Sequence, residues 1–537
     1  MERLQYLAVQ FLQLSRTTGD RTMPSYLHPG VYIEEIPSGS KPIEAVGTST
    51  AAFVGYADEG PFKEPTFITS WEDYENNFGG FRERKKPEDP DDLMGRAVYA
   101  FFQNGGGKAY IVRVADDAAA PASGALTDSD PLTVEAFSPG LWGNGLRVRI
   151  TAQDKTKDKV NEALFDVEVG REDDNLTFIA QESYDALSLD KDSDQFIAEL
   201  LPEKSERVGK VTVANAGDAL TAINTAGDSG ITIELSAGAN GDIADKLEYD
   251  DVFSKFLKYR DINIILLPDK NWNDDKETIQ SAISHCETMK NRMVIPDLKP
   301  TQELEKAKDI TDMKLTTSSY AAIYYPWPKT RNPFFDAEKN PNVPRLLPVP
   351  ASAYAAGQWA KTDGNRGVWK APAGVANGLL GLNKLSYTVE DAEQDYLNPL
   401  GINAFRQLPN YGAVVWGSRT LATKADPEWR YIPVRRTAMF IEESIFNGIH
   451  WAVFEPNDHR LWSALRLNIE SFMSGLHRSG AFQGEKSSDA YFVRCGLGQT
   501  MTQGDIDRGQ VIVQVGFAPL KPAEFVIVRI QQKVGQK

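Results

Sequence analysis

Continuous apolar runs occur in two distant parts of the chain and have the length of buried strands. The runs cover residues 49–57, 108–115 and 261–269. Strands that are apolar on both faces are typical of a parallel sheet with helices over each side. Because amphipathic segments separate these runs, we expect a discontinuous α/β core built from residues 48–115 together with 256–400.

Helix signals mark the segments between the first two predicted strands. Ser70 is a good helix N-cap, Asp73 stands three residues later, and Gly79-Gly80 end the segment. The glycines at 105–107 end a second predicted helix. They precede a lysine, but the run lacks the first glycine and the Ser or Thr of a phosphate-binding loop. We therefore interpret them as a turn without phosphate chemistry.

The segment between the two halves of the core alternates apolar and polar residues over short stretches. Glycine, aspartate and serine separate these stretches, which predicts a mostly β insertion at 116–255. The insertion is also acidic, because Asp116 to Arg260 contain 29 Asp and Glu against 14 Lys and Arg. Nearly all of the net charge of −17 lies there. This charge favours a solvent-facing surface and argues against nucleic-acid binding, which needs a basic face.

Amphipathic helices return in the C-terminal part of the chain. Residues 457–480 predict a helix with an apolar stripe and Asn457 as its N-cap, within an α+β domain at 401–520. Before it, Arg430, Arg435 and Arg436 form the densest basic patch. The interpretations that stay open are a solvated helix start, internal pairing with Glu442 and Glu443, or an electrostatic seat for an acidic partner surface.

Each end of the chain carries a short apolar strand. The predicted strand residues are Val31, Tyr32 and Ile33 at one end, and Phe525, Val526, Ile527, Val528 and Ile530 at the other. An exposed apolar strand with free backbone groups invites pairing with other chains. The two strands can pair within one molecule, or each can add to a sheet in a neighbour. Residues 1–22 read either as an added helix or as an upstream start used in place of Met23.

Motifs for catalysis, cofactors or metals are missing from the sequence. Cys286 and Cys495 are too far apart and too few for a disulfide framework, so we expect buried or half-buried thiols. The five histidines show no metal-ligand spacing, and no run of 18 apolar residues predicts a membrane span. We expect no cofactor, no metal site and no catalytic site.

Long motifs follow one another along the chain. They are "YLHPGVYIEEIPSGSKPIEAVGTSTAAFVGYADEGP", "SWEDYENNFGG", "YAFFQNGGGKAYIVRV", "SSYAAIYYPW", "VPASAYAAGQWAKTDGNRGVWKAPAG", "LNPLGINAFRQLPNYGAVVWGSRTLA", "EWRYIPVRRTAMFIEESI" and "SGAFQG". In this order they resemble contractile tail sheath proteins of contractile phages and phage-derived injection systems. Residues 1–22 and the acidic insertion take no part in the resemblance.

The resemblance implies a structural protein rather than an enzyme. Such subunits stack as six-fold discs into a helical sleeve around an inner tube, in a metastable extended form that contracts on triggering. The implied partners are copies of the chain, the tube protein, and baseplate and tail-terminator proteins, without nucleic acid or direct membrane insertion. The sleeve is expected to assemble in the cytoplasm of the producing cell and then to form part of a phage tail or injection particle.

The resemblance also gives roles to individual segments. Arms at 23–47 and 521–537 are expected to exchange strands with neighbouring subunits, and the domain at 401–520 to face the tube. The insertion is then the outer domain. The expected tube-contact residues are Arg430, Arg435 and Arg436, and the expected hinges are Pro37, Pro42, Pro519 and Pro522.

Two other functions are alternatives to the sheath. One is an α/β enzyme with a site in the Pro- and Gly-rich 330–380 region, where Arg345, Lys361, Asp363 and Arg366 could gather. The other is a different self-assembling shell protein. No residue spacing supports a particular reaction.

Overall fold

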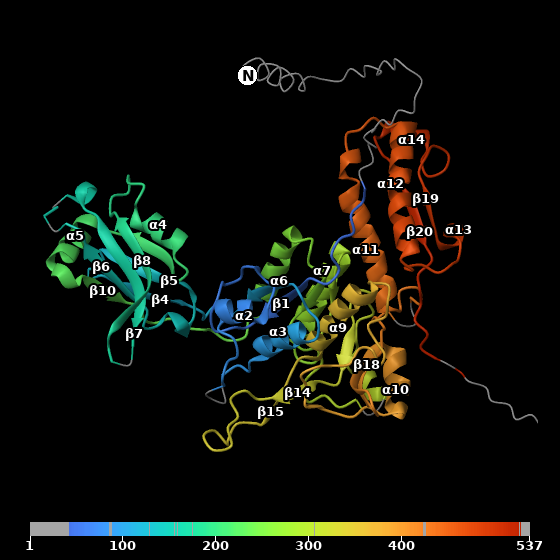
Figure 1. The fold of residues 1–537 in the computed structure, drawn as a ribbon, viewed down its shortest axis with the longest axis horizontal. Helices are drawn as coiled ribbons and strands as arrows, with labels where there is room; N and C mark the ends of the chain where they lie inside the picture. The colour runs from blue at the N-terminus through green and yellow to red at the C-terminus, as the bar shows by residue number, and fades with distance from the viewer. Residues whose placement is uncertain are drawn as a thin grey trace, which may run out of the picture. The chain divides into compact units, whose positions relative to one another are not determined.

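The computed structural model describes residues 42–537, apart from 85–88, 128, 155, 158, 174, 305–306, 423–425, 526 and 528–537. Contacts set Met1–Lys41 apart from Pro42–Lys537, and the fold below is that of the second unit. It is a mixed α/β protein (Figure 1). The predicted strand residues Val31, Tyr32, Ile33, Val526, Val528 and Ile530, and the predicted hinge Pro37, lie outside the described residues.

A five-stranded sheet in the order β12-β11-β1-β3-β2 forms the centre of the core. Its strands are β1 (Ala51–Gly55), β2 (Thr66–Ile68), β3 (Ala109–Arg113), β11 (Ile264–Leu266) and β12 (Met293–Val294). β1 pairs in parallel with β3 and with β11, so Ala51 lies opposite both Ala109 and Ile264. All residues of β1 and β11 are buried. Distant apolar runs therefore meet in one parallel sheet, as their pattern predicts.

Helices cover both faces of this sheet. On one side lie α2 (Trp71–Phe78), α3 (Leu93–Gln103) and α9 (Ala351–Arg366), and on the other α6 (Lys246–Lys255) and α7 (Lys276–Met289). Phe53 packs among the first set and Val54 among the second, because neighbouring residues of a strand point to opposite faces. The predicted capping box of α2 is present, since Ser70 and Asp73 each accept a backbone N–H from the other.

Helix α6 shows where the insertion ends. Tyr249, Val252 and Phe253 of α6 are buried in the same apolar cluster as β11. We therefore assign α6 to the core and place the end of the insertion before Lys246, whereas the prediction placed it at residue 255. The acidic composition continues into α6, but the apolar side of this helix is buried in the core.

A second sheet extends the core beyond β12. It contains β13 (Ile323–Tyr325), β17 (Ile402–Leu408) and β18 (Gly412–Trp416), with β13 parallel to β17. A parallel bridge between Val294 and Ala321 joins it to the first sheet. We therefore assign β17 and β18 to the core, whereas the prediction placed a domain boundary at residue 400.

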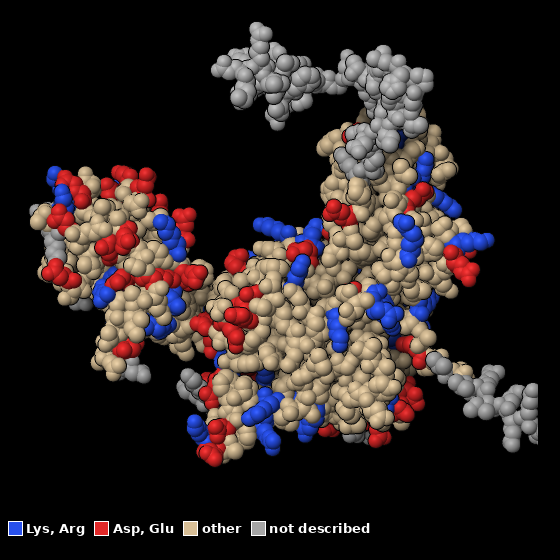
Figure 2. All heavy atoms as spheres, in the orientation of Figure 1, with Lys and Arg blue, Asp and Glu red and all other residues tan. Residues whose placement is uncertain are grey.

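The insertion consists of two antiparallel sheets and two helices. The sheets run β10-β6-β7-β8 and β4-β5-β9. Their strands are β4 (Pro121–Ala125), β5 (Leu132–Pro139), β6 (Arg147–Ala152), β7 (Phe165–Glu172), β8 (Phe178–Leu187), β9 (Val208–Val213) and β10 (Ile231–Glu234), and the helices are α4 (Ile197–Lys204) and α5 (Ala216–Thr225). Inward-facing residues such as Val148 and Val167 form a separate apolar cluster. Acidic side chains are spread over its visible face among basic and uncharged ones (Figure 2).

Arg113 ties the core to the insertion. It is fully buried at the end of β3, where its Nε donates to Ala57 O at 2.6 Å. Its Nη1 donates to Pro139 O at the end of β5, at 2.7 Å. One guanidinium therefore satisfies backbone carbonyls on both sides of the junction.

The C-terminal part adds a helical pair and a hairpin. Its elements are α11 (Ile432–Gly448), α12 (His459–Arg478), α13 (Ser487–Ala490), β19 (Tyr491–Arg494), α14 (Gln503–Asp507) and β20 (Gln514–Phe517). The remaining short elements are α8 (Ala307–Asp312), β14 (Pro328–Arg331), β15 (Leu346–Pro348), β16 (Lys384–Leu385) and α10 (Asp391–Leu397). Asp458 caps α12, not Asn457 as predicted. Asn457 instead accepts a hydrogen bond from Trp462 Nε1 at 2.8 Å.

Candidate assembly interface

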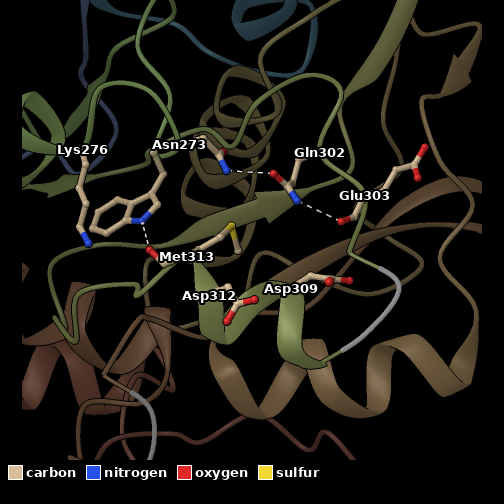
Figure 3. A pocket seen from close by; sticks show the side chains of 8 residues that line it. Asn273, Lys276, Gln302, Glu303, Asp309, Asp312 and Met313 are labelled. Carbon is tan, nitrogen blue, oxygen red and sulfur yellow. Dashed lines mark hydrogen bonds between the residues drawn. The ribbon is translucent and has the colours of Figure 1, made fainter.

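The cavity shown in Figure 3 has a volume of about 610 Å³. Hydrogen bonds across it join one loop to another. Trp272 Nε1 donates to Met313 O at 3.0 Å, and Asn273 Nδ2 donates to Gln302 Oε1 at 2.9 Å. These polar groups therefore hold the loops around the cavity together. None of the residues of the enzyme hypothesis lines the cavity.

The four residues of the enzyme hypothesis do not gather in one place. Lys361, Asp363 and Arg366 all lie on α9, where residues two apart point to different sides of the helix. Asp363 is ion-paired with Arg436, while Arg345 and Arg366 are exposed. The arrangement therefore supplies no shared substrate site.

In the part of the chain that the structure describes, no three His, Cys, Asp or Glu residues are placed to hold a metal ion together. In the same residues no helix has the length and apolarity to cross a membrane. Cys286 and Cys495 are buried free thiols, which confirms that prediction.

The N-terminal arm is anchored along α11 where it enters the body. Ile43 is buried against Gly448, so closely that a Cβ on this glycine would lie 2.7 Å from Ile43 Cγ1. The Val46 backbone N–H donates to Ser444 Oγ at 3.2 Å. The segment from Ile43 to Thr50 is therefore the root of the N-terminal arm, and α11 is its support.

A buried ion pair closes this root. Arg436 of α11 donates to Asp363 of α9 through both terminal nitrogens, at 2.9 and 2.6 Å. Arg436 Nη2 also donates to Thr48 O at 2.8 Å, and Thr48 Oγ1 donates to Asp363 Oδ2 at 2.6 Å. The Arg436 guanidinium lies 4.6 Å from the centre of the Trp359 ring. Two helices and the arm root thus share one network of charge-assisted hydrogen bonds.

The C-terminal arm is anchored by a second ion pair. Glu524 accepts hydrogen bonds from Arg419 Nε, at 2.9 Å, and from Arg419 Nη2. It also accepts one from the Tyr431 hydroxyl at 3.2 Å. Hydrogen bonding and the charge of Glu524 outweigh burial and raise the pKa of Arg419. Of the described residues that follow, Phe525 is 74% exposed and Ile527 is 79% exposed.

Helix α11 connects the two roots. Tyr431, which binds the C-terminal root, is the N-cap residue of α11. Arg436 and Ser444, which bind the N-terminal root, lie further along the same helix. A displacement of either arm root is therefore opposed by bonds to one rigid element.

The predicted basic patch is mostly internal. Arg435 is 7% exposed and Arg436 is 3% exposed. Arg435 stacks on Trp429, with its guanidinium 3.6 Å from the ring centre, and its Nε donates to Ser319 Oγ at 3.1 Å. Burial lowers the pKa of Arg435.

The interpretation of Arg435 and Arg436 as an electrostatic seat for a partner does not fit their burial, because aromatic rings and a carboxylate of the same chain enclose them. Only Arg430 is half-buried. Internal contacts are present for both arginines: Arg436 pairs with Asp363, and Arg435 interacts electrostatically with Glu442. Glu443 pairs with Arg260 at 2.6 Å.

Sequence reasoning missed Arg419, Glu524 and Tyr431. Glu524 is one charged residue between a proline-rich linker and an apolar strand, and that position is the signal that could have marked an anchor. The predicted hinges Pro42, Pro519 and Pro522 lie beside the two roots. Pro519 takes part in an antiparallel bridge with Phe482.

Two family models, each for one domain of phage tail sheath proteins, match this chain. Residues 243–421 match the phage tail sheath protein central domain, and residues 424–533 match the phage tail sheath C-terminal domain. Together these segments make up more than half of the chain. The chain therefore belongs to the contractile tail sheath protein family.

Individual relatives agree with this assignment. The tail sheath protein of Enterobacteria phage T4 is 26% identical over 211 residues, which are 39% of this chain and 30% of that protein. The tail sheath protein of Burkholderia phage BcepMu is 30% identical over 177 residues, which are 32% of this chain and 35% of that protein. The chain thus spans less than half the length of the curated relatives it matches.

Solved structures extend the similarity over nearly the whole chain. The PVC sheath complex of an extracellular contractile injection system, in its contracted state, has a TM-score of 0.56 and 25% identity, and the alignment covers 96% of this chain and 99% of that one. The helical sheath of the anti-feeding prophage, also contracted, has a TM-score of 0.55 and 25% identity over 95% of this chain and 100% of that one.

Proposed function

We propose that this chain is the repeating subunit of a contractile sheath. Copies stack as six-fold discs into a helical sleeve around an inner tube, and the sleeve contracts to drive the tube through a target envelope. The observation that carries this proposal is that both arms are fixed at their roots by ion pairs, while the apolar Phe525 and Ile527 beyond the second root are exposed on the subunit. An anchored but uncovered apolar segment is suited to completing a sheet in another copy.

Strand exchange supplies the links between subunits in this proposal. Val31, Tyr32 and Ile33 of one arm, and Phe525, Val526, Ile527, Val528 and Ile530 of the other, are the donated residues. Each added main-chain hydrogen bond contributes about 0.5–1.5 kcal/mol net, and apolar burial adds to this. Links of this kind hold neighbours together while the subunit bodies rotate.

Contraction then works as a change between two packings of one folded subunit. The extended sleeve is metastable and is held by the tube, and a signal from the baseplate releases one disc after another. Rotation is absorbed at Pro37 and Pro42 on one arm and at Pro519 and Pro522 on the other. The roots and α11 move with the body, because their ion pairs are internal to it.

The remaining surfaces have proposed neighbours. The C-terminal domain faces the tube, with Arg430 as the charged candidate of the original three, while Arg435 and Arg436 hold the subunit together from inside. The acidic insertion faces outward. Baseplate and tail-terminator proteins bind the two ends of the sleeve, which assembles in the cytoplasm and becomes part of a phage tail or injection particle.

Deletion of residues 525–537 tests the proposal and retains the Glu524 anchor. The variant should stay folded, with the thermal unfolding temperature of the full chain, but should form no sleeves by electron microscopy. Substitution of the exposed Leu176, far from the arms in sequence, by Ser is a matched control that should leave sleeves intact. Sleeves of normal length from the deletion variant would reject strand donation. Closed shells from the full chain would favour a different assembly.

A further inference from the structure

The segment between α6 and β11 is held to the core through its backbone carbonyls. It begins with the short 3-10 helix η4 (Phe256–Lys258). The fully buried Arg292 donates from Nη1 to Phe256 O at 3.1 Å and from Nη2 to Tyr259 O at 2.6 Å. Asn291 Nδ2 donates to Arg260 O at 2.9 Å. We call residues 256–260 the joint, because side chains that precede β12 fix this turn at three carbonyls.

The joint is also bound to α11. Arg260 donates to Glu443 of α11 through Nε at 2.8 Å and through Nη2 at 2.6 Å. Helix α11 is the support of both arm roots. The joint therefore connects α6, the residues before β12 and α11, and its position depends on the Arg292 guanidinium.

His285 of α7 is the one titratable ring in contact with this guanidinium. It is buried, and its ring centre lies 5.6 Å from that of Phe253 and 6.4 Å from that of Phe256. Its Nε2 lies 3.3 Å from Arg292 Nη1. A guanidinium can only donate hydrogen bonds, so Nε2 accepts and the imidazole is neutral, with its proton on Nδ1.

A second proton on His285 is incompatible with this arrangement. The imidazolium has no acceptor nitrogen, and its charge lies beside that of Arg292 in a buried site. Burial, and then the charge of Arg292, lower the pKa of the His285 imidazole from its ordinary value of 6.5 to about 4. The neutral ring therefore stabilises the fold fully above pH 6.5, and this stability is lost as the pH falls from 6.5 towards 4.

We propose that His285 is an acid-sensitive switch: when its imidazole binds a second proton it repels Arg292, and the bonds that hold the joint weaken. The charge that acts on the imidazole is that of Arg292, and the rings packed on it from α6 and η4 carry no charge. The other titratable or charged groups around the pair are Asp250 of α6, Cys286 of α7, Arg260 and Asp261 after η4, and Glu443 of α11. The switch belongs to the single folded subunit and does not rest on the proposed function.

Urea unfolding of the free subunit at pH 7.5 and pH 4.5 tests the switch. The amide oxygen of His285→Gln can accept from Arg292 but takes no proton, and the control is His459→Gln, whose histidine is exposed. Over this interval the folding equilibrium constant of the wild type should fall roughly 50-fold relative to that of His285→Gln. Buried carboxyls such as Asp297 respond to pH in the opposite sense, but they are common to all three chains and cancel in the comparison. His459→Gln should follow the wild type, and an equal pH response in His285→Gln would overturn the proposal.

A measurement on the wild type keeps the proposal testable even where His285→Gln does not fold. The five histidines are labelled with carbon-13, and their imidazole signals are followed by NMR from pH 7.5 to pH 4. Substitutions of the other four, His28, His450, His459 and His477, assign their signals and leave one signal for His285. This signal should remain that of a neutral imidazole down to about pH 5, because its pKa is lowered. Titration of His285 near pH 6.5 would contradict the switch.

Amide hydrogen exchange locates the effect in the chain. After correction for the intrinsic pH dependence of exchange, peptides covering residues 253–262 should be less protected at pH 4.5 than at pH 7.5 in the wild type but not in His285→Gln. Equal protection of these peptides at both pH values in the wild type would show that the joint is not what His285 controls.

Discussion

Arg436 and Asp363 form a two-pronged ion pair in which the side chains are 3% and 6% exposed. The pair joins α11 to α9 and also fixes Thr48 at the root of the N-terminal arm. Arg436, which belongs to the densest basic patch of the sequence, therefore makes an internal contact and is not part of a surface for a partner. In the proposed assembly, a pull on the arms acts on this ion pair and on the one between Glu524 and Arg419.

Asp363→Ala should destabilise the subunit strongly. Removal of one partner leaves the Arg436 charge buried and unpaired, which typically costs about 3–5 kcal/mol. Urea unfolding gives the free energy of unfolding directly. Arg366→Gln, an exposed substitution on the same helix, is the control and should change this free energy by about 0.5 kcal/mol or less. A small effect of Asp363→Ala would show that the pair does not hold α9 and α11 together.

Glu524→Gln should loosen the C-terminal root with a smaller effect on the body. The neutral amide cannot pair with the charge of Arg419, and lost hydrogen bonds to charged groups cost about 1.5–3 kcal/mol. Limited proteolysis should therefore cut the chain after Pro519 faster than in the wild type, while global unfolding changes little. Asp507→Asn, an acidic residue outside the root, provides the control. Unchanged cleavage in Glu524→Gln would mean that the ion pair does not fix the arm.

Stability should fall between about pH 4 and pH 7, in part because of Asp297. Burial raises the pKa of this carboxyl to about 7, although hydrogen bonds from Ser352 lower it. A carboxyl whose folded-state pKa lies above its unfolded value binds more protons when folded. It therefore destabilises the fold progressively as the pH rises from the unfolded pKa to the folded one.

Asp297→Asn should reduce this pH dependence, which unfolding temperatures at pH 5 and pH 8 will show. Asp336→Asn is a suitable control. Backbone hydrogen bonds lower the pKa of exposed Asp336, so it titrates below this interval. If the unfolding temperatures at pH 5 and pH 8 differed as much in Asp297→Asn as in the wild type, Asp297 would not explain the pH dependence.

Local patterns predicted the strands and caps of the core well. The apolar run that forms β1 is buried on both faces, and such a run can be recognised from its own residues alone. The capping box of Ser70 and Asp73 is likewise encoded within a few residues. The insertion strands alternate with a period of two, as β6 does, and were equally readable.

Ion pairs between residues far apart in the chain could not be predicted from one sequence. Asp363 and Arg436 are 73 residues apart, and Arg419 and Glu524 are 105 apart, so no local rule connects them. The acidic composition of α6 also suggested that this helix belongs to the insertion, although one face of it packs on the core. For these reasons the sequence indicated the arms but not their anchors.

The central claim is that the arms complete sheets in adjoining copies. A cryo-EM structure of the assembled particle tests it most directly, at a resolution that traces the backbone from Glu524 onward. The account predicts that Phe525 to Ile530 pair as a strand with a neighbouring subunit while Glu524 stays bound to Arg419 of its own. A strand that turns back to pair only with its own subunit would contradict it.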